Sequence, residues 1–443
     1  MQEQWQSRIG FVLAAIGAAV GLGNIWRFAY VAGENGGGVF LLTYVCFVIL
    51  IGWPLVIAEI TIGRRSGGDT VTAIEAAGGS PRWRVGGWLL VVGALLILSY
   101  YSVIAGWAVR YFVGALTGGL WEATAHGYGE YFERFIANGI EPIIWQALIL
   151  AVSGFVVAGG IQQGIERLNL LLMPLLALIV AGLAIFSLTL PGSGAGVRFL
   201  LAPDWSAFGR PSLYLAALGQ AFFSLGLGMA VFITYGGYLG ASTRIPGAAA
   251  TVVAGDTLFA LVAGLAIFPA VFALGGDPAA GPRLAFVTFP QILLQLPGGW
   301  LVGPIFFFLL SAAALTSMIS LLEVGVTYAV NRLGIPRIRA SWGLTGVVLL
   351  LGVPSALSYG LLDGITLLGL PVLDAIDQGI SNFVLPIGGL LVAALVGWRM
   401  ARAHALADAD LAGSRLGPAW LWAVRVLAPA MIVVILVRSL GIF

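Results

Sequence analysis

The chain has 443 residues, of which 60% are hydrophobic and 9% are charged, and its formal net charge is +2. Because an ordinary soluble domain carries about 25% charged residues, this composition excludes a soluble globular protein. Apolar runs that can cross a hydrocarbon core of about 30 Å recur along the whole chain. The sequence therefore predicts an all-α polytopic membrane protein whose surroundings are a lipid bilayer, with no nucleic acid as a partner.

Eleven membrane-spanning helices are predicted in chain order. They cover residues 9–30, 37–63, 86–117, 142–160, 166–190, 211–240, 245–275, 299–332, 340–356, 366–398 and 418–440. The first run is too long and too rich in glycine for a signal peptide, so we interpret it as a mature span. The longest connection, about 118–141, is predicted to contain a short surface helix.

Arginine is distributed unevenly between the two sets of connections. One set holds Arg8, Arg64, Arg65, Arg82, Arg84, Arg167, Arg244, Arg332, Arg337, Arg339, Arg399, Arg402 and Arg415. The other set holds only Arg134, Arg198, Arg210, Arg283 and Arg438. Since basic connections remain in the cytoplasm, we expect a protein of the cell membrane with a cytoplasmic N-terminus and an outer C-terminus.

Two of the predicted spans contain the same tripeptide. Residues 17–27 read GAAVGLGNIWR in the first span, and residues 222–229 read FFSLGLGM in the sixth. Because the break recurs five spans later, an odd number, a repeat at 211–398 would be inverted relative to 9–190, and 418–440 would lie outside both. Interrupted helices at matching positions of inverted halves indicate a transporter binding site, although glycine also serves as a packing notch in membrane helices.

Longer stretches carry a family resemblance. They are GAAVGLGNIWRF (17–28), ENGGGVF (34–40), SYYSVIAGW (99–107), GQAFFSLGLGMAVFITYGGY (219–238), GLAIFPAVFA (264–273) and AALTSMISLLE (313–323). From Trp5 through the last span, the chain resembles the neurotransmitter:sodium symporter family, in particular its bacterial amino-acid transporters. The resemblance implies one transporter domain over residues 1–443, with eleven transmembrane helices in a LeuT-type 5+5 inverted repeat whose helices 1 and 6 are interrupted.

Two sodium sites follow from the resemblance. The first would use the Ala19 carbonyl and the side chains of Asn24, Ser224 and Asp256. The second would use the carbonyls of Gly17, Val20 and Ala313 and the hydroxyls of Thr316 and Ser317. Exposed carbonyls of a broken helix suit such a cation. Taken alone, the last two hydroxyls would be expected to bond to their own helix.

The resemblance also implies a substrate site. It would be lined by Ala19, Gly21, Gly23, Ile97, Tyr101, Phe223, Gly226, Met229, Ser317 and Leu321. Monoamine-transporting relatives have Asp at the position of Gly21, so the ligand here is expected to be an amino acid, with Tyr101 donating to its carboxylate. The pocket offers no charge to a side chain, and Met229 is an adaptable wall, so large neutral substrates are favoured.

Chloride is not expected as a partner ion. Relatives that need chloride have Asn where this chain has Asp256, and a nearby Ser where it has Ala260. The residues that hold the anion, Tyr44, Gln220 and Ser224, are present. A carboxylate beside a sodium site supplies the charge that chloride would bring, and it repels an anion. The alternative is a protonated structural Asp.

The resemblance places a gate on each side of the site. The outer gate would pair Arg27 with Asp377 above a lid of Tyr101 and Phe223, with Asp374 as the competing partner. An Arg inside a span is costly unless it is paired or wetted.

At the inner side, Gln2 and Asn331 stand where relatives have an ion pair, so that pair is predicted to be absent and Trp5 and Tyr238 are left to close this face. Gly164 and Pro174 are spaced as in relatives where helix 5 unwinds. Pro174 weakens the turn before it, although such kinks are routine. Glu59 and Glu323, also inside spans, are interpreted as structural or water-lined, with proton handling as the alternative.

The sequence thus predicts a sodium-coupled importer of neutral hydrophobic L-amino acids, aliphatic or aromatic, that works by alternating access with two sodium ions and acts as a monomer or weak dimer. The alternative is a LeuT-fold sensor that binds an amino acid without transporting it. An enzyme is not expected, because an intramembrane aspartyl protease needs paired Asp residues, a metalloenzyme needs clustered ligands, and the chain has only two His.

Overall fold

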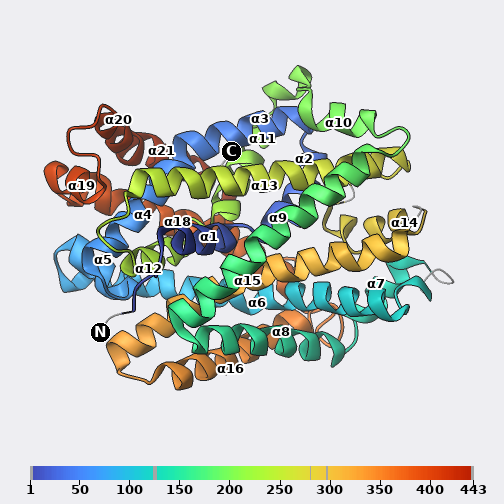
Figure 1. The fold of residues 1–443 in the computed structure, drawn as a ribbon, viewed down its shortest axis with the longest axis horizontal. Coiled ribbons are helices and arrows are strands. Elements are labelled where there is room, and N and C mark those ends of the chain that lie inside the picture. Colours follow the sequence, from blue (N-terminus) through green and yellow to red (C-terminus); the bar gives the residue numbers. More distant parts are fainter. Residues whose placement is uncertain (1–2, 123–126, 280, 296–297, 441–443) are drawn as a thin grey trace.

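A computed structural model describes residues 3–122, 127–279, 281–295 and 298–440 (Figure 1). Long helices run roughly side by side along the horizontal axis of that view. The first half of the chain forms α1 (Arg8–Ala19), α2 (Phe28–Glu34), α3 (Gly38–Phe47), α4 (Trp53–Ser66), α5 (Thr70–Gly78), α6 (Arg84–Thr117), α7 (Tyr128–Ile136), α8 (Glu141–Ala158), α9 (Arg167–Leu188) and α10 (Gly194–Leu201). The second half forms α11 (Pro211–Leu225), α12 (Val231–Gly237), α13 (Ile245–Ala273), α14 (Thr288–Gln295), α15 (Gly299–Leu333), α16 (Arg337–Ala356), β1 (Thr366–Leu367), β2 (Leu370–Pro371), α17 (Val372–Gly379), α18 (Leu385–Ala394), α19 (Arg402–Asp408), α20 (Leu416–Trp422) and α21 (Ala428–Ser439).

Short π-helical and 3-10 segments join or extend these helices. The π segments are η1 (Gly23–Arg27), η2 (Val48–Gly52), η5 (Ile161–Glu166), η8 (Ile380–Val384), η9 (Leu395–Arg399) and η10 (Ala423–Leu427). The 3-10 segments are η3 (Pro81–Trp83), η6 (Trp205–Gly209) and η7 (Gly281–Leu284). Single π turns occur often at functional sites, and η1 lies directly after the first predicted break.

Ten of the eleven predicted spans are long and apolar enough to cross a membrane, and they follow the predicted order. Within the described ranges, nine helices are long and apolar enough to cross a membrane. The bent pair Arg8–Ala19 and Gly23–Glu34, whose halves differ in direction by 53°, makes a tenth. The remaining predicted span is α11 with α12, which flank a break at residues 226–230.

The start of the tenth predicted span is wrong. Residues 366–371 form the antiparallel strands β1 and β2, and the helix begins only at Val372. The turn between the strands places Leu368 and Gly369 at φ values of 54° and 82°. Such left-handed residues end a helix, and the proline at 371 donates no backbone hydrogen bond.

Short helices outside the spans gather at the two ends of the molecule. In Figure 1, α5 and α19 lie at the left end, near the N-terminus, and α7, α10 and α14 lie at the right end. The sequence predicted only the helix at 118–141, which is α7, with residues 123–126 outside the described part. We call the left end, which includes the N-terminus, the Trp5 end, and the opposite end the Arg27 end.

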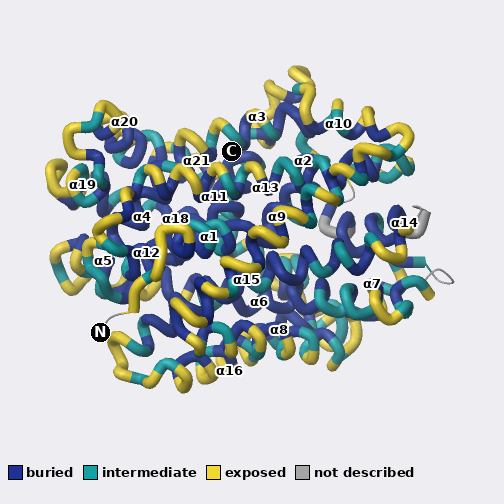
Figure 2. Tube along the Cα trace, in the orientation of Figure 1, coloured by how far each residue is buried: buried dark blue, intermediate teal, exposed yellow. Residues whose placement is uncertain are grey.

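The two broken spans run antiparallel to each other at the centre of the bundle. The first half of the first span, α1, contacts α12, the second half of the sixth span. Conversely, η1 and α2 contact α11. This pairing is what an inverted repeat requires. Figure 2 shows these central segments largely buried, whereas apolar side chains on the perimeter, such as Phe155 and Leu178, are exposed as lipid-facing residues are.

Only glycine fits at position 228, because of its backbone conformation and because of the atoms packed against it. Its φ is 76°, and a Cβ there would overlap the Leu385 carbonyl oxygen and lie 2.9 Å from the Gly389 nitrogen. Gly228→Ala is therefore expected to destabilise the protein by at least about 2 kcal/mol, since left-handed strain alone costs about 1–3 kcal/mol. Thermal unfolding in detergent measures this. Gly219→Ala in α11 is the matched control, because nothing lies within 4 Å of its added Cβ; an equal loss in both variants would contradict the argument.

Candidate functional site

At the first Gly-Leu-Gly the helix is interrupted, and side chains accept the hydrogen bonds of its backbone N–H groups. The Gly21 N–H donates to Asn24 Oδ1 at 3.0 Å, and the Leu22 N–H donates to the Tyr101 hydroxyl oxygen at 3.0 Å. A Cβ on Gly21 would lie 2.5 Å from Ser317 Oγ and 2.7 Å from the Tyr101 hydroxyl. Gly21 is thus present because two polar side chains approach its backbone closely.

The second Gly-Leu-Gly is broken by its own dihedral angles. Gly226, Gly228 and Ala230 have φ values of 64°, 76° and 62°, so alternate residues are left-handed. Glu59, which is fully buried, accepts from the Gly228 N–H at 2.8 Å and holds the break from the side of α4. A left-handed Ala is strained, which is typical of functional segments.

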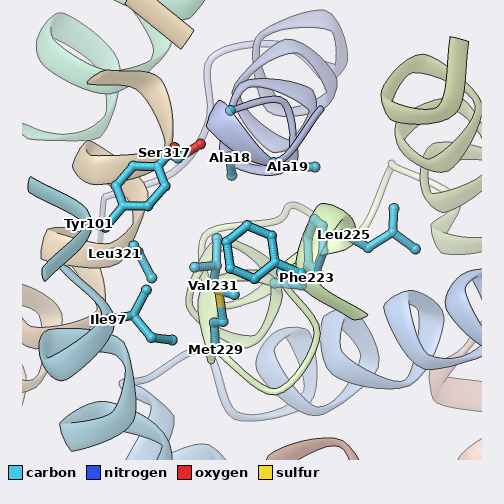
Figure 3. Close-up of a pocket in the computed structure, with 14 residues that line it drawn as sticks. Ala18, Ala19, Ile97, Tyr101, Phe223, Leu225, Met229, Val231, Ser317 and Leu321 are labelled. Carbon is cyan, nitrogen blue, oxygen red and sulfur yellow. The ribbon is translucent and has the colours of Figure 1, made fainter. Parts of the chain in front are cut away.

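Between the two breaks lies a small cavity of about 30 Å³. Figure 3 shows Tyr101 and Ser317 on one side of it and Phe223, Met229 and Val231 across from them. Every residue predicted to contact substrate lines it: Ala19, Gly21, Gly23, Ile97, Tyr101, Phe223, Gly226, Met229, Ser317 and Leu321. The sequence did not predict four further lining residues, Ala18, Leu225, Val231 and Phe232. Ala18 and Leu225 adjoin predicted residues in the chain, and Val231 and Phe232 follow Met229 by two and three residues.

Three side chains of the first predicted sodium site form one buried hydrogen-bond cluster. Asn24 Nδ2 donates to Asp256 Oδ1 at 2.6 Å and to Ser224 Oγ at 3.0 Å. Ser224 Oγ and the Tyr44 hydroxyl donate to Asp256 Oδ2 at 2.9 and 3.4 Å. All four side chains are at most 1% exposed. Ala19, the last residue of α1, lines the adjacent cavity.

All of the donors around Asp256 are neutral, and no ion pair among the described residues includes it. Ala260 is buried on the same helix, α13. Tyr44 and Ser224, which would hold an anion in chloride-dependent relatives, therefore donate to a carboxylate here. Such a set of carboxylate, amide and hydroxyl oxygens fits a hard cation.

Four of the five residues predicted for the second site lie in contact. Thr316 Oγ1 donates to the carbonyls of Ala313 at 2.8 Å and Val20 at 3.4 Å. Ser317 Oγ donates to the same two carbonyls at 3.5 and 3.3 Å. Gly17 lies one helical turn before Val20 on α1. The hydroxyls thus bond to their own helix, as a purely structural reading expects, and also bridge to the broken helix.

At the Arg27 end, the predicted outer ion pair is not formed. Arg27 donates to Gln220 Oε1 at 2.7 Å and lies over the Phe223 ring at 4.6 Å from its centroid. Asp377 accepts from Ser381 and Asp374 from Tyr359 instead. A cavity of about 400 Å³ lies above Phe223 and is lined by Arg27, so this end of the path is open enough to leave the arginine without a carboxylate.

The Trp5 end is closed, as the tryptophan and tyrosine rings predicted for the inner gate suggest. Trp5 Nε1 donates to the Tyr235 carbonyl at 3.0 Å, and its ring packs edge-on against Tyr235 and Tyr238. The Tyr238 hydroxyl in turn donates to Glu323 at 2.6 Å.

This end nevertheless contains ion pairs, formed by residues other than those predicted for the inner gate. Arg337 pairs with Glu323 at 2.7 Å and with Glu3 at 3.5 Å. Gln2 lies outside the described residues, and Asn331 is not part of this network. The ion pairs of Arg337 with Glu323 and Glu3 thus stand in for the inner ion pair of relatives. The sequence signal that could have revealed them is an Arg at the start of one span, α16, and a Glu inside the preceding span, α15.

The fifth membrane span, made of η5 and α9, is helical throughout in this structure. Residues 161–166 form η5, and α9 continues through Pro174 without a break. Unwinding between Gly164 and Pro174 therefore stays a prediction for another conformation.

Comparison with known proteins places this site in a family. A sequence model of the sodium:neurotransmitter symporter family matches residues 2–134 and 136–443. The uncharacterized sodium-dependent transporter YhdH of Bacillus subtilis is 40% identical over 99% of this chain and 98% of its own. An uncharacterized sodium-dependent transporter of Haemophilus influenzae is 33% identical, with the same two coverages.

A solved structure is similar over the whole chain. The crystal structure of MhsT in complex with L-phenylalanine matches with a TM-score of 0.93 and 49% sequence identity, covering 99% of this chain and all of that one. The chain therefore belongs to the sodium:neurotransmitter symporter family and is a sodium-dependent membrane transporter with the LeuT-type fold.

Proposed function

We propose that the protein imports neutral hydrophobic L-amino acids, aliphatic and aromatic, together with two sodium ions and without chloride. The observation that carries this proposal is the cavity between the two breaks. Its walls are apolar except for Tyr101, Ser317 and exposed backbone, which gather at one side. A zwitterion would place its charged end there and its side chain among Ile97, Met229 and Leu321.

The cavity must widen to hold such a substrate. A cavity of about 30 Å³ holds only two or three water molecules, since one water needs at least about 10–15 Å³. Phe223, stacked beneath Arg27, and Met229, which is unbranched and adaptable, are the side chains placed to move. Alternating access then requires the Trp5 end to open while the outer cavity closes.

Two sodium ions supply enough free energy for strong accumulation. At about 100 mV each charge contributes ~2.3 kcal/mol, and a tenfold gradient adds ~1.4 kcal/mol. Two ions together give roughly 7.4 kcal/mol, which corresponds to about five decades of accumulation of a neutral zwitterion. Both oxygen clusters described above fit this stoichiometry, and Asp256 removes the need for an accompanying anion.

The charge distribution supports an orientation. The Trp5 end carries the basic connections with Arg64, Arg65 and Arg84, so we place it in the cytoplasm and the C-terminus outside the cell membrane. The protein then rests with its cytoplasmic side closed and its outer cavity open. We propose that it acts as a monomer or weak dimer.

Uptake of labelled leucine and phenylalanine into proteoliposomes tests the proposal, with sodium and chloride varied independently. We expect uptake that requires sodium and is unchanged when gluconate replaces chloride. A chloride requirement would contradict the role of Asp256 and leave the transport function standing. Sodium-dependent binding without uptake would instead identify an amino-acid sensor.

A further inference from the structure

The last membrane span contains an arginine well inside its length. Arg425 lies in η10, nine residues after Leu416, the first residue of the span Leu416–Ser439. Because a helix rises about 1.5 Å per residue, the Arg425 Cα lies roughly 14 Å along the helix axis from Leu416. In Figure 1, α20, which begins this span, lies near α19 at the Trp5 end. A charged side chain inside a span is costly, so the contacts of Arg425 have to account for it.

One nitrogen of Arg425 has a structural role. Its Nε donates to the Gly397 carbonyl at 2.5 Å. Gly397 lies in η9, in the last turn of the preceding span, where carbonyls lack partners within their own helix. A Cβ on Gly397 would lie 3.0 Å from the Arg425 Cα, so glycine lets the two helices approach closely here. The arginine therefore caps the C-terminal end of the preceding helix, which favours a positive charge.

This capping bond leaves both Nη groups of Arg425 without a protein partner. Neither donates a hydrogen bond to another described residue, and no ion pair among the described residues includes Arg425. The two acidic residues in the connection between these spans, Asp408 and Asp410, already pair with Arg65 and Arg64. The cap thus explains one N–H of the guanidinium and leaves four others to be satisfied from outside the protein.

Arg425 lies at a surface that faces lipid. Trp422, three residues earlier on the same helix, is 57% exposed, and Trp398, next to Gly397, is 62% exposed. Tryptophan is enriched where a membrane helix passes from hydrocarbon into the headgroup layer. Side chains on a helix lean toward its N-terminus, which for this span is at the Trp5 end. The Arg425 guanidinium is therefore within reach of the headgroups of the leaflet at that end.

We propose that Arg425 binds the phosphate of an anionic phospholipid in the leaflet at the Trp5 end. A guanidinium presents paired N–H groups that match two phosphate oxygens. Arg402 and Arg415, in the connection between the last two spans, add positive charge, whereas its two acids are already paired. The surroundings therefore favour an anionic lipid over a zwitterionic one. The lipid lies at the seam between the last two spans, where Gly397 brings them together.

Native mass spectrometry of the purified full-length protein tests the inference, with phosphatidylglycerol or phosphatidylcholine added to the detergent. We expect the wild type to bind one phosphatidylglycerol about tenfold more tightly than one phosphatidylcholine. Arg425→Gln keeps an amide donor for the Gly397 carbonyl and removes the charge, so its affinity for phosphatidylglycerol should fall about tenfold. Arg425→Lys keeps the charge without the paired N–H groups, so it should lose only about threefold.

Arg339→Gln is the matched control. Arg339 is another exposed arginine near the Trp5 end, since it follows Arg337, which pairs with Glu3. We expect this variant to bind phosphatidylglycerol as the wild type does. An equal loss in Arg339→Gln would show a response to net charge alone, and an unchanged affinity in Arg425→Gln would show that Arg425 is only a helix cap; either result would overturn the lipid site. Equal binding of the two lipids by the wild type would overturn it without any variant.

Discussion

Asp256→Asn is expected to raise the sodium concentration for half-maximal amino-acid binding at least tenfold. Asp256 is fully buried, its hydrogen-bond donors Asn24, Ser224 and Tyr44 are neutral, and it brings a negative charge to the predicted first sodium site. A tenfold change corresponds to about 1.4 kcal/mol, the lower end of the range for an interaction between a charge and its ligand. Sodium titrations of labelled phenylalanine binding to the purified variant measure it.

Two further variants make this experiment decisive. Asp69→Asn changes another buried Asp, which caps α5 away from the site, and should alter stability but not the sodium requirement. Asp256→Asn combined with Ala260→Ser recreates the side chains of chloride-dependent relatives, so added chloride should partly restore its sodium affinity. An unchanged sodium requirement in Asp256→Asn would show that the carboxylate does not face the ion.

Arg337→Ala is expected to destabilise the protein by about 3–5 kcal/mol, the usual cost of leaving one charge of a buried pair alone. Glu323 is 0% exposed and would keep only the hydroxyls of Tyr238 and Thr327 as partners. Thermal unfolding in detergent reports the loss. Adding Glu323→Gln should recover most of it, because the second substitution removes the stranded charge.

Arg332→Ala provides the comparison on a half-exposed ion pair. Arg332 pairs with Glu75 at 2.8 Å, nearly the distance of the Arg337 pair, but both side chains are partly exposed. Hydrogen bonds from Arg84 and Arg332 lower the pKa of the Glu75 carboxyl, so the pair stays ionised at neutral pH. Exposed pairs contribute about 0–1 kcal/mol, and a similar loss in both variants would mean that burial of Glu323 carries no penalty.

The spans and the cavity were predictable because their signals are local. Each span is a long apolar run, and each break carries its own glycines, so the residues around both breaks could be named from the sequence. The two identical tripeptides nevertheless act differently. Gly226 and Gly228 are left-handed, whereas Gly21 and Gly23 are not, and Gly21 instead makes room for Tyr101 and Ser317. That difference depends on neighbours far away in the chain.

The gates were less predictable for the same reason. The ion pairs at the Trp5 end join Arg337 to Glu3 and Glu323, which come from different segments and meet only in the folded molecule. The predicted outer pair of Arg27 and Asp377 is absent for another reason. In this conformation Arg27 contacts Gln220 and the Phe223 ring instead.

Residues 3–7 precede the first helix, yet they bond to three different parts of the bundle. Glu3 reaches Arg337 and the Ile161 N–H, Trp5 reaches Tyr235, and Ser7 reaches Glu166. In protein-engineering terms, this short segment is an integral part of the Trp5 end, although it resembles a dispensable tail. A fluorophore or affinity tag placed within it would compete with these contacts, whereas one at the exposed turn at Leu368, which makes none of them, would leave them intact.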